Sequence, residues 1–279
     1  MKSNALIYRM NEEMRLRCLS NSTISNYERE VTEFFDYLQI GNNNPSQEQI
    51  REYLLYLLDK NVGYAKYKMA LHSINYLFKK VLKIQWKIAP VPYPKNIKKL
   101  PVVLSCHEIK KLIYGATNEK SRCILNLMYC AGLRRRELTN LLITDVDKER
   151  MQLFIRKSKG CKDRYVPISN KTLQMLRNYY KQYRPQKYLF NGYRKAVPIS
   201  DSALRHILKN ALSNTTIKKT VCLHTLRHSF ATHLLEKGIP ITVLQHFLGH
   251  SRLLSTLTYL RIIPGHLTNY HNFLEGLDI

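Results

Sequence analysis

Apolar residues recur every three or four positions along the first ninety residues, the spacing that lines one side of a helix. In the segment "STISNYEREVTEFFDYLQIG" they fall at Tyr27, Val31, Phe34, Phe35 and Leu38. The stretches "IREYLLYLLDK" and "YAKYKMALHSINYLFKKVL" repeat the pattern, and Ser46 with Gln49 predicts a capping box ahead of the first. Because no alternating strand pattern interrupts these segments, the sequence predicts a small all-helical domain over residues 1–88.

The pattern changes at "IAPVPYPKNIKKLPVVLS", which holds four prolines in a short stretch. Proline removes a backbone donor and disfavours helix, so residues 89–102 are predicted to be an extended linker. The chain beyond it, residues 103–279, is expected to form a second domain. Ser105 and Glu108 predict another capping box there, and Gly132 predicts the end of the apolar helix "SRCILNLMYCAG".

The second domain also contains a segment of a different kind. Two runs typical of strands, "QLFIRK" and "RYVPI", flank the polar tip "SKGCKD", which predicts a β-hairpin with a longer loop. Helical spacing returns from "KTLQMLRNYYKQY" to the end of the chain. We therefore expect a mainly α protein whose second domain is α+β, mostly helical with a small antiparallel sheet.

Charge narrows the class of partner. The chain carries 45 Lys+Arg against 20 Asp+Glu, a formal net charge of +25, which favours a polyanion such as nucleic acid. A merely basic protein, for example a ribosomal one, has the same balance. The six cysteines form no C-x-x-C pair, and no signal-peptide core or run of eighteen apolar residues is present. These features indicate reduced thiols and a cytoplasmic protein.

Basic residues that can carry chemistry gather in two loops of the second domain. Three consecutive arginines, residues 134–136, follow Gly132 at a helix junction, where a guanidinium can grip a phosphate with two hydrogen bonds. The tip of the predicted hairpin carries Lys157, Lys159 and Lys162. Taken singly, each loop is more typical of a solvated basic turn than of a functional site.

Histidines mark a third place, "HTLRHSFATHLLEKG". His224, Arg227 and His228 lie one helical turn apart and therefore share a face, whereas His233 falls on the packing face of the same helix. Two histidines at this spacing can bind zinc. The glutamate of an H-E-x-x-H site is absent, however, and Cys222 is the only nearby thiol, so we expect no metal here.

A fourth place is "LGHSRLLSTLTY", in which Tyr259 follows His250 by nine residues. The helix before it begins at Ile239-Pro240 and ends at Gly249. This order of a helix, a tight turn and a second helix also occurs in the helix-turn-helix motif. The possibility of a DNA-binding module without catalytic activity therefore stays open. Alone, Tyr259 would be interpreted as a packing residue.

The order and spacing of these segments resemble the tyrosine recombinase (phage integrase) family over the whole chain. "AGLRRREL", "KGCKDRYVPI", "HTLRH", "LGH" and the following tyrosine appear in the family's order. The resemblance is to the Xer-like or small integrase type and implies a SAM-like core-binding domain followed by a catalytic domain. It assigns the catalytic set as Arg134, Lys159, His224, Arg227, His250 and Tyr259.

The resemblance implies a metal-free DNA transesterification without a cofactor. The Tyr259 oxygen attacks a phosphodiester to give a 3′-phosphotyrosine and a free 5′-hydroxyl, and His224 is expected to accept the phenol proton. Arg134 and Arg227 stabilise the transition state, and His250 donates a further hydrogen bond to the phosphate. Lys159 is expected to protonate the leaving oxygen. Because the motif residues include no carboxylate cluster, cleavage is expected in the presence of a chelator.

The implied partner is double-stranded DNA, bound by a homotetramer on two sites. The tail "NYHNFLEGLDI" is expected to dock on the neighbouring protomer or on its own domain. Two alternatives stay open: a catalytically silent DNA-binding relative and a type IB topoisomerase. Within the family, three subclasses stay open: a Xer-type resolvase, a small mobile-element integrase and a DNA invertase. One departure is Arg252, which stands where similar enzymes commonly carry an acidic residue.

Overall fold

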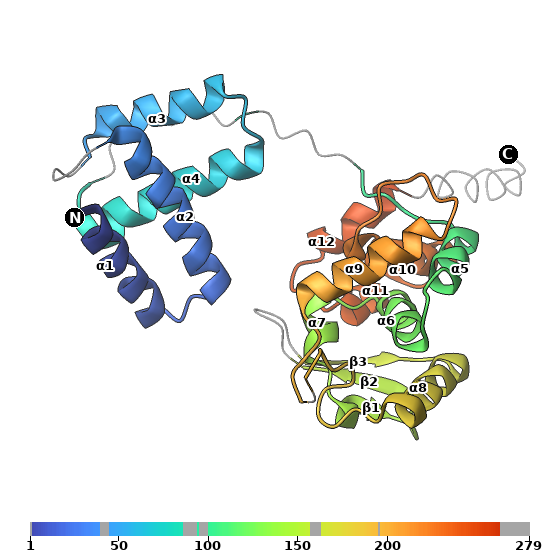
Figure 1. The fold of residues 1–279 in the computed structure, drawn as a ribbon. Helices are drawn as coiled ribbons and strands as arrows, with labels where there is room; N and C mark the ends of the chain where they lie inside the picture. Colours follow the sequence, from blue (N-terminus) through green and yellow to red (C-terminus); the bar gives the residue numbers. More distant parts are fainter. Residues whose placement is uncertain are drawn as a thin grey trace, which may run out of the picture. The chain divides into compact units, whose positions relative to one another are not determined.

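A computed structural model describes residues 2–39, 45–85, 94, 100–156, 163–194 and 196–262. The chain divides into two compact units, residues 1–98 and residues 99–279. Figure 1 colours the first unit blue to cyan and the second green to red. Among the described helices, none is both long and apolar enough to cross a membrane.

Every described secondary-structure element of the first unit is a helix, as the spacing of apolar residues predicts. Its elements are α1 (Lys2–Leu16), α2 (Asn21–Leu38), α3 (Gln47–Asp59), α4 (Tyr64–Tyr76) and a π-helical continuation, η1 (Leu77–Leu82). Phe34, Leu54 and Ile74 form one core between α2, α3 and α4. Met10 and Val31 belong to a second core, between α1, α2 and η1.

Both predicted capping boxes are present at the starts of their helices. The Gln49 backbone N–H donates to the Ser46 hydroxyl over 3.2 Å, and the Ser46 N–H donates to the Gln49 side chain over 2.8 Å. Ser105 and Glu108 make the same reciprocal pair at the start of α5 (Cys106–Tyr114). These pairs satisfy backbone donors that a helix leaves without intrahelical partners.

The second unit combines helices with one small sheet. Its further elements are α6 (Glu119–Cys130), α7 (Arg135–Asn140), η2 (Ile143–Asp145), α8 (Asn170–Tyr183), α9 (Asp201–Ser213), α10 (Leu223–Glu236), α11 (Ile241–Leu248), α12 (Leu254–Leu257) and η3 (Thr258–Arg261). The strands β1 (Val146–Asp147), β2 (Gln152–Ile155) and β3 (Arg164–Pro167) pair antiparallel in that order. The predicted hairpin is confirmed as β2 and β3, while its tip with Lys159 lies outside the described residues.

Helix α10 runs through the interior of this unit, against α6, α9, α11 and η3 (Figure 1). Ten of its fourteen residues are buried. A helix buried on so many sides carries polar residues into the interior as well as apolar ones. Arg227 is the largest such residue, with 1% of its surface exposed, and His233 lies on the packing side, as predicted.

Candidate active site

The turn after α6 brings the first arginine to α10. Gly132 has φ +56°, and a Cβ added there would lie 2.4 Å from the Phe230 ring, so only glycine fits the turn. Its carbonyl accepts a hydrogen bond from Arg227 Nη1 over 2.6 Å. Arg134 follows as the residue that caps α7. The predicted helix end at Gly132 thus fixes the position of Arg134 beside Arg227.

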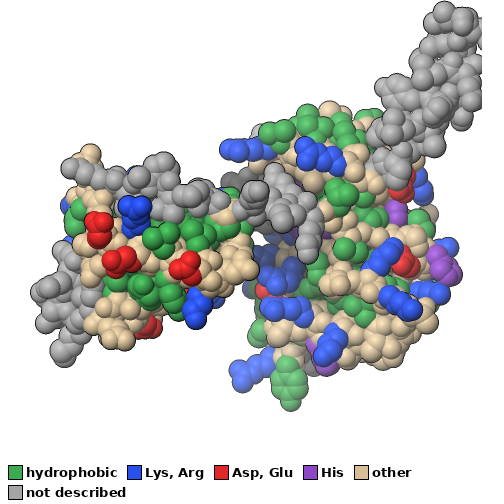
Figure 2. All heavy atoms as spheres, turned by 90° about the horizontal axis from the view of Figure 1, so that it is seen from above, with side chains coloured by type: hydrophobic (Ala, Val, Ile, Leu, Met, Phe, Trp, Pro, Cys, Tyr) green, Lys and Arg blue, Asp and Glu red, His purple; other side chains and the backbone are tan. Residues whose placement is uncertain are grey.

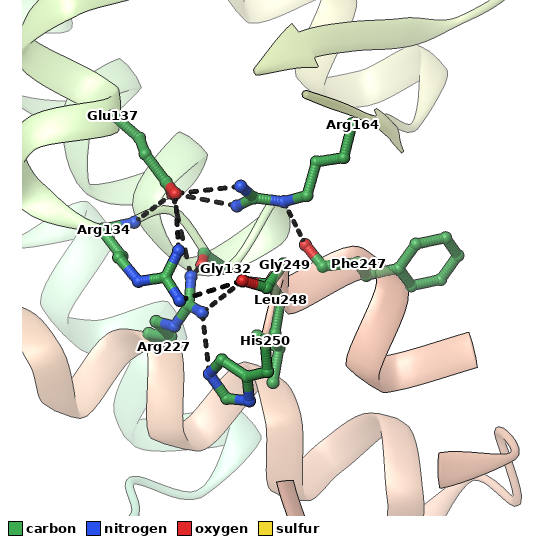
Figure 3. A network of polar contacts seen from close by, with 9 residues as sticks. All are labelled: Gly132, Arg134, Glu137, Arg164, Arg227, Phe247, Leu248, Gly249 and His250. Carbon is green, nitrogen blue, oxygen red and sulfur yellow. Dashed lines mark hydrogen bonds and ion pairs between the residues drawn. The ribbon is translucent and has the colours of Figure 1, made fainter. Parts of the chain in front are cut away.

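A buried carboxylate lies at the centre of the network in Figure 3. Arg164 grips Glu137 with two hydrogen bonds of 2.9 Å, and Arg134 Nη1 donates to the same carboxylate over 2.9 Å. Arg227 is the third guanidinium on this carboxylate, with its Nη1 in an ion pair with Glu137 Oε2 over 3.8 Å. One negative charge therefore holds three guanidinium groups in fixed positions.

The charges of this network do not cancel. Burial would raise the pKa of the Glu137 carboxyl, but the hydrogen bonds and charge of Arg164, the Arg134 backbone N–H and the charge of Arg227 lower it to about 2. Glu137 is therefore ionised, and three guanidinium charges oppose one carboxylate. The excess of positive charge makes the site complementary to an anion.

Arg164 ties the sheet to the end of α11. Its Nε donates to the Phe247 carbonyl over 2.7 Å. Gly249, which follows α11 with φ +59°, packs so closely that an added Cβ would lie 2.9 Å from Arg164 Nη1. The glycine thus allows both the backbone conformation and the close approach of the guanidinium. This contact positions the loop that carries His250.

Arg227 and His250 meet directly. Arg227 Nη2 donates to the Leu248 carbonyl over 2.5 Å and lies 3.1 Å from His250 Nε2. Because arginine only donates, Nε2 is the acceptor and His250 Nδ1 carries the proton, which it donates to the Thr256 hydroxyl over 2.9 Å. Burial and the charges of Arg227, Arg134 and Arg164 lower the pKa of His250 to about 4, so the ring is neutral.

Tyr259 lies within this site, with only 3% of its surface exposed. Its hydroxyl lies 3.2 Å from His228 Nδ1, and its ring is parallel to that of His250, with centroids 6.4 Å apart. Burial raises the pKa of the Tyr259 phenol, and the charges of Arg227 and Arg134 offset part of that rise. The phenol is therefore protonated at neutral pH and needs a base to become a good nucleophile.

His224 lies at the rim of the site. Its side chain is exposed, and its ring meets that of His228 edge-on with centroids 4.6 Å apart. Partial burial and the charges of Arg227 and Arg134 lower its pKa. Of the six residues assigned by resemblance, Arg134, Arg227, His250 and Tyr259 lie in one cluster with His224 beside it, and Lys159 lies outside the described residues.

Three members of the site were not predicted from the sequence. They are Glu137, Arg164 and, as the partner of the Tyr259 hydroxyl, His228. A signal for Glu137 was present, because a carboxylate three residues after Arg134 fits a capping box. Arg164 lay in "KDRYVP" without any local feature that indicates burial.

A basic cavity of about 1010 Å³ opens beside Arg134 and His224. The other positively charged side chains that line it are Arg135, Arg136, Arg156, Arg205 and Lys209. Arg135 is held by Asp201 over 3.0 Å and Arg156 by Asp145 over 2.7 Å. Figure 2 shows Lys and Arg side chains on the visible face of the second unit. Among the described residues, no group of three or more His, Cys, Asp or Glu could hold a metal ion.

The sequence pattern of the phage integrase family matches residues 103–265, and that of the phage integrase N-terminal SAM-like domain matches residues 6–88. The chain belongs to the phage integrase family. A putative integrase/recombinase of Sinorhizobium fredii, y4qK, is 37% identical to this family member over 91% of the chain and 83% of its own length. The tyrosine recombinase of Thermosipho africanus is 33% identical over 87% of this chain and 89% of its own length.

Solved structures agree with the fold of this integrase-family chain. The XerA recombinase has 28% identity and a TM-score of 0.57, covering 97% of this chain and 98% of that one. XerH bound to its difH substrate has 20% identity and a TM-score of 0.73, and the match covers 92% of this chain and 93% of the XerH chain. The predicted architecture, a helical SAM-like domain followed by a mostly helical α+β domain, is confirmed.

Proposed function

We propose that Tyr259 is the nucleophile of this site-specific DNA recombinase, and that Arg134, Lys159, His224, Arg227 and His250 complete its catalytic set. The observation that carries the proposal is the place of Tyr259. Its ring lies parallel to that of His250, which contacts Arg227, and its hydroxyl lies 3.2 Å from His228 Nδ1, in a site with excess positive charge. A phosphodiester is the anion that suits such a site. Its non-bridging oxygens can accept hydrogen bonds from the guanidinium groups of Arg134 and Arg227.

In the proposed reaction the Tyr259 oxygen bonds to phosphorus as the bond from phosphorus to the 5′-oxygen breaks. The products are a 3′-phosphotyrosine and a 5′-hydroxyl, and Lys159 supplies the proton of that hydroxyl. Arg134 and Arg227 stabilise the added charge of the five-coordinate transition state. Attack by a second 5′-hydroxyl reverses each step and rejoins the strand. The phosphotyrosine conserves the bond energy, so no nucleotide triphosphate is needed.

Double-stranded DNA is the proposed partner, bound by residues 1–88 as a core-binding domain and residues 103–279 as a catalytic domain, with residues 89–102 as the linker. The basic lining of the cavity supports phosphate contacts outside the site of cleavage. A lambda integrase tetramer on a Holliday junction shares the fold, with a TM-score of 0.71. We extend its assembly to this protein as a homotetramer on two DNA sites in the cytoplasm. The tail over residues 269–279, which lies outside the described residues, is proposed to dock on the neighbouring protomer or on its own domain.

A covalent trapping experiment tests the function. The binding site is first selected by the full-length protein from random duplexes and is then rebuilt with a nick close to the cleavage position, so that a short fragment leaves and rejoining fails. Wild-type protein should form a covalent protein–DNA species, with or without EDTA, that Tyr259→Phe does not form. Tyr193→Phe, a change at a fully exposed tyrosine, is the matched control. Tight binding by the wild type without a covalent species would make the protein a silent DNA-binding relative.

A further inference from the structure

His228 occupies a place in the site that the proposed catalytic set does not use. It follows Arg227 on α10 and lies one helical turn beyond His224. The ring is half-buried, and its Nδ1 lies 3.2 Å from the Tyr259 hydroxyl. That separation is within the reach required of a group that takes a proton from the hydroxyl.

The neighbours of Tyr259 determine the direction of this hydrogen bond. Burial raises the pKa of the phenol, and the positive charges of Arg227 and Arg134 act against that rise. A nearby positive charge attracts the lone pairs of the phenol oxygen and repels its O–H, which favours donation from this O–H to His228 Nδ1 over 3.2 Å. His228 is then the tautomer that carries its proton on Nε2.

The other two histidines of the site are oriented differently. Both ring nitrogens of His250 have partners, since Nε2 accepts from Arg227 and Nδ1 donates to Thr256. The exposed ring of His224 contacts the ring of His228. Within the described residues, His228 is the histidine whose accepting nitrogen faces the nucleophile.

We propose that His228 is the general base for Tyr259, an inference that rests on the proposed function. As the Tyr259 oxygen bonds to phosphorus, its proton moves to His228 Nδ1, while the leaving 5′-oxygen takes a proton from Lys159. In rejoining, the phosphorus–tyrosine bond breaks and His228 returns the proton to the phenol oxygen. Protons therefore balance in both directions without water or metal.

The charges around His228 keep it neutral before DNA binds. Burial and the charges of His224 and Arg227 lower the pKa of His228 to about 4. Among the described residues, the ionisable groups that act on or contact it are His224 and Arg227 on its own helix and Tyr259 on η3. Arg134 acts on Arg227 by its charge, and the ring of His250 contacts Arg227 and lies parallel to that of Tyr259. A bound phosphodiester adds negative charge to this cluster and raises the pKa of His228, because an adjacent anion favours the protonated ring. His228 thus becomes an effective base only with DNA in place.

Three variants separate a base from a simple hydrogen-bond partner. Asparagine at position 228 keeps an acceptor at the place of Nδ1 but cannot hold a proton, alanine removes the acceptor, and His224→Ala tests the neighbouring ring. Single-turnover cleavage of the nicked site is measured with saturating full-length protein, across pH. His228→Asn and His228→Ala should both slow cleavage by roughly 10²–10⁴-fold, the usual contribution of a general base. Added imidazole should restore part of the His228→Ala rate, and His224→Ala should slow cleavage less than either.

The result that overturns the inference is His228→Asn cleaving within a few-fold of wild type, because a hydrogen bond without proton transfer would then suffice. Equal loss in His224→Ala, with imidazole rescuing that variant instead, also overturns it and assigns the base to His224. The DNA affinity and the urea midpoint of His228→Asn are measured as controls. Values equal to those of the wild type exclude a folding defect in this variant. Failure of the proposed function itself looks different, because the wild type would then form no covalent species.

Discussion

Arg164 and Glu137 form a two-pronged ion pair in which both side chains are almost wholly buried, with both N–O distances at 2.9 Å. The pair joins strand β3 to helix α7, and Glu137 also holds Arg134 and Arg227 (Figure 3). Desolvation offsets much of the attraction in such a pair, so its net contribution to stability is small. Its main consequence is geometric, because the carboxylate fixes the guanidinium groups that are proposed to bind the phosphate.

Glu137→Gln should be strongly destabilising and should slow DNA cleavage. The change removes the carboxylate charge while three guanidinium groups stay in place, and breaking a buried ion pair on one side costs about 3–5 kcal/mol. Urea denaturation measures the loss. Glu119→Gln is the control, because Glu119 pairs with Arg122 near the surface over 3.3 Å, and such pairs contribute at most about 1 kcal/mol. Equal losses in both variants would contradict the role given to Glu137.

Gly249→Ala should lower both the free energy of unfolding and the cleavage rate. Alanine is strained at φ +59°, and its Cβ would lie 2.9 Å from Arg164 Nη1, which forces the guanidinium away from Glu137. Gly238→Ala is the matched control, since Gly238 has φ +80° and nothing within 4 Å of the added Cβ. Both variants carry backbone strain, about 1 kcal/mol, but only Gly249→Ala should also slow cleavage. Urea midpoints and single-turnover rates measure the two effects.

Arg227→Lys should abolish most cleavage while DNA binding survives. Lysine retains the charge but cannot serve the Gly132 and Leu248 carbonyls and a phosphate together, as the guanidinium can. Loss of one transition-state donor typically slows a reaction by about 10²–10³-fold. The rate of covalent complex formation and the DNA affinity are measured side by side, with Arg177→Lys on the exposed side of α8 as control. A parallel fall in affinity and rate would make Arg227 a binding residue only.

Arg205→Ala and Lys209→Ala should weaken DNA binding in a salt-dependent way. Both side chains are exposed and line the basic cavity beside Arg134. Each lost phosphate contact should reduce the slope of log affinity against log salt by about 0.9. Fluorescence anisotropy at several salt concentrations measures the slope, and cleavage at saturating protein should change little. Lys181→Ala serves as the control, because Lys181 is also exposed. If the salt slopes of Arg205→Ala and Lys209→Ala equal that of Lys181→Ala, the proposed phosphate contacts of Arg205 and Lys209 are refuted.

Protonation of His228 and His250 should destabilise the DNA-free protein in mild acid. The pKa of each is lowered to about 4 in the folded state, chiefly by burial, against about 6.5 when unfolded. The folded state then binds fewer protons, so this stability is present above pH 6.5 and is lost as the pH falls from 6.5 to 4. Urea midpoints against pH test this expectation. In the double variant His228→Asn, His250→Asn, the urea midpoint should change less with pH between 6.5 and 4. The same pH dependence as in the wild type would contradict the claim that both rings are buried and neutral in the folded state.

Local patterns predicted the elements of the fold because each depends on neighbouring residues. The helix starts at Ser46 and Ser105 and the hairpin of β2 and β3 are set by side chains a few positions apart. The candidate site depends on distant contacts: Arg164 meets Phe247 across 83 positions. No helical or strand spacing marks such a pair. Order and spacing of motifs indicated Arg134, Arg227, His250 and Tyr259, but the buried carboxylate that holds the arginines required the three-dimensional structure.

The same distinction applies to the histidines. The sequence placed His224, Arg227 and His228 on one helical face and, by resemblance, favoured His224 as the proton acceptor. In the structure the Tyr259 hydroxyl lies against His228 Nδ1, 31 positions away along the chain. The position of Tyr259 depends on the loop after α11, which Arg164 and Gly249 hold, and on the packing of η3 against α10, and both are contacts between residues far apart in the sequence.

Mass spectrometry of the trapped protein–DNA species tests the central claim most directly. After proteolysis and nuclease digestion, the peptide that contains Tyr259 should carry a nucleotide remnant attached through the phenol oxygen to a 3′-phosphate. The 5′ end of the released strand should be an unmodified hydroxyl. A remnant on any other residue, or a 5′-phosphate linkage, would contradict the account of Tyr259 as the nucleophile.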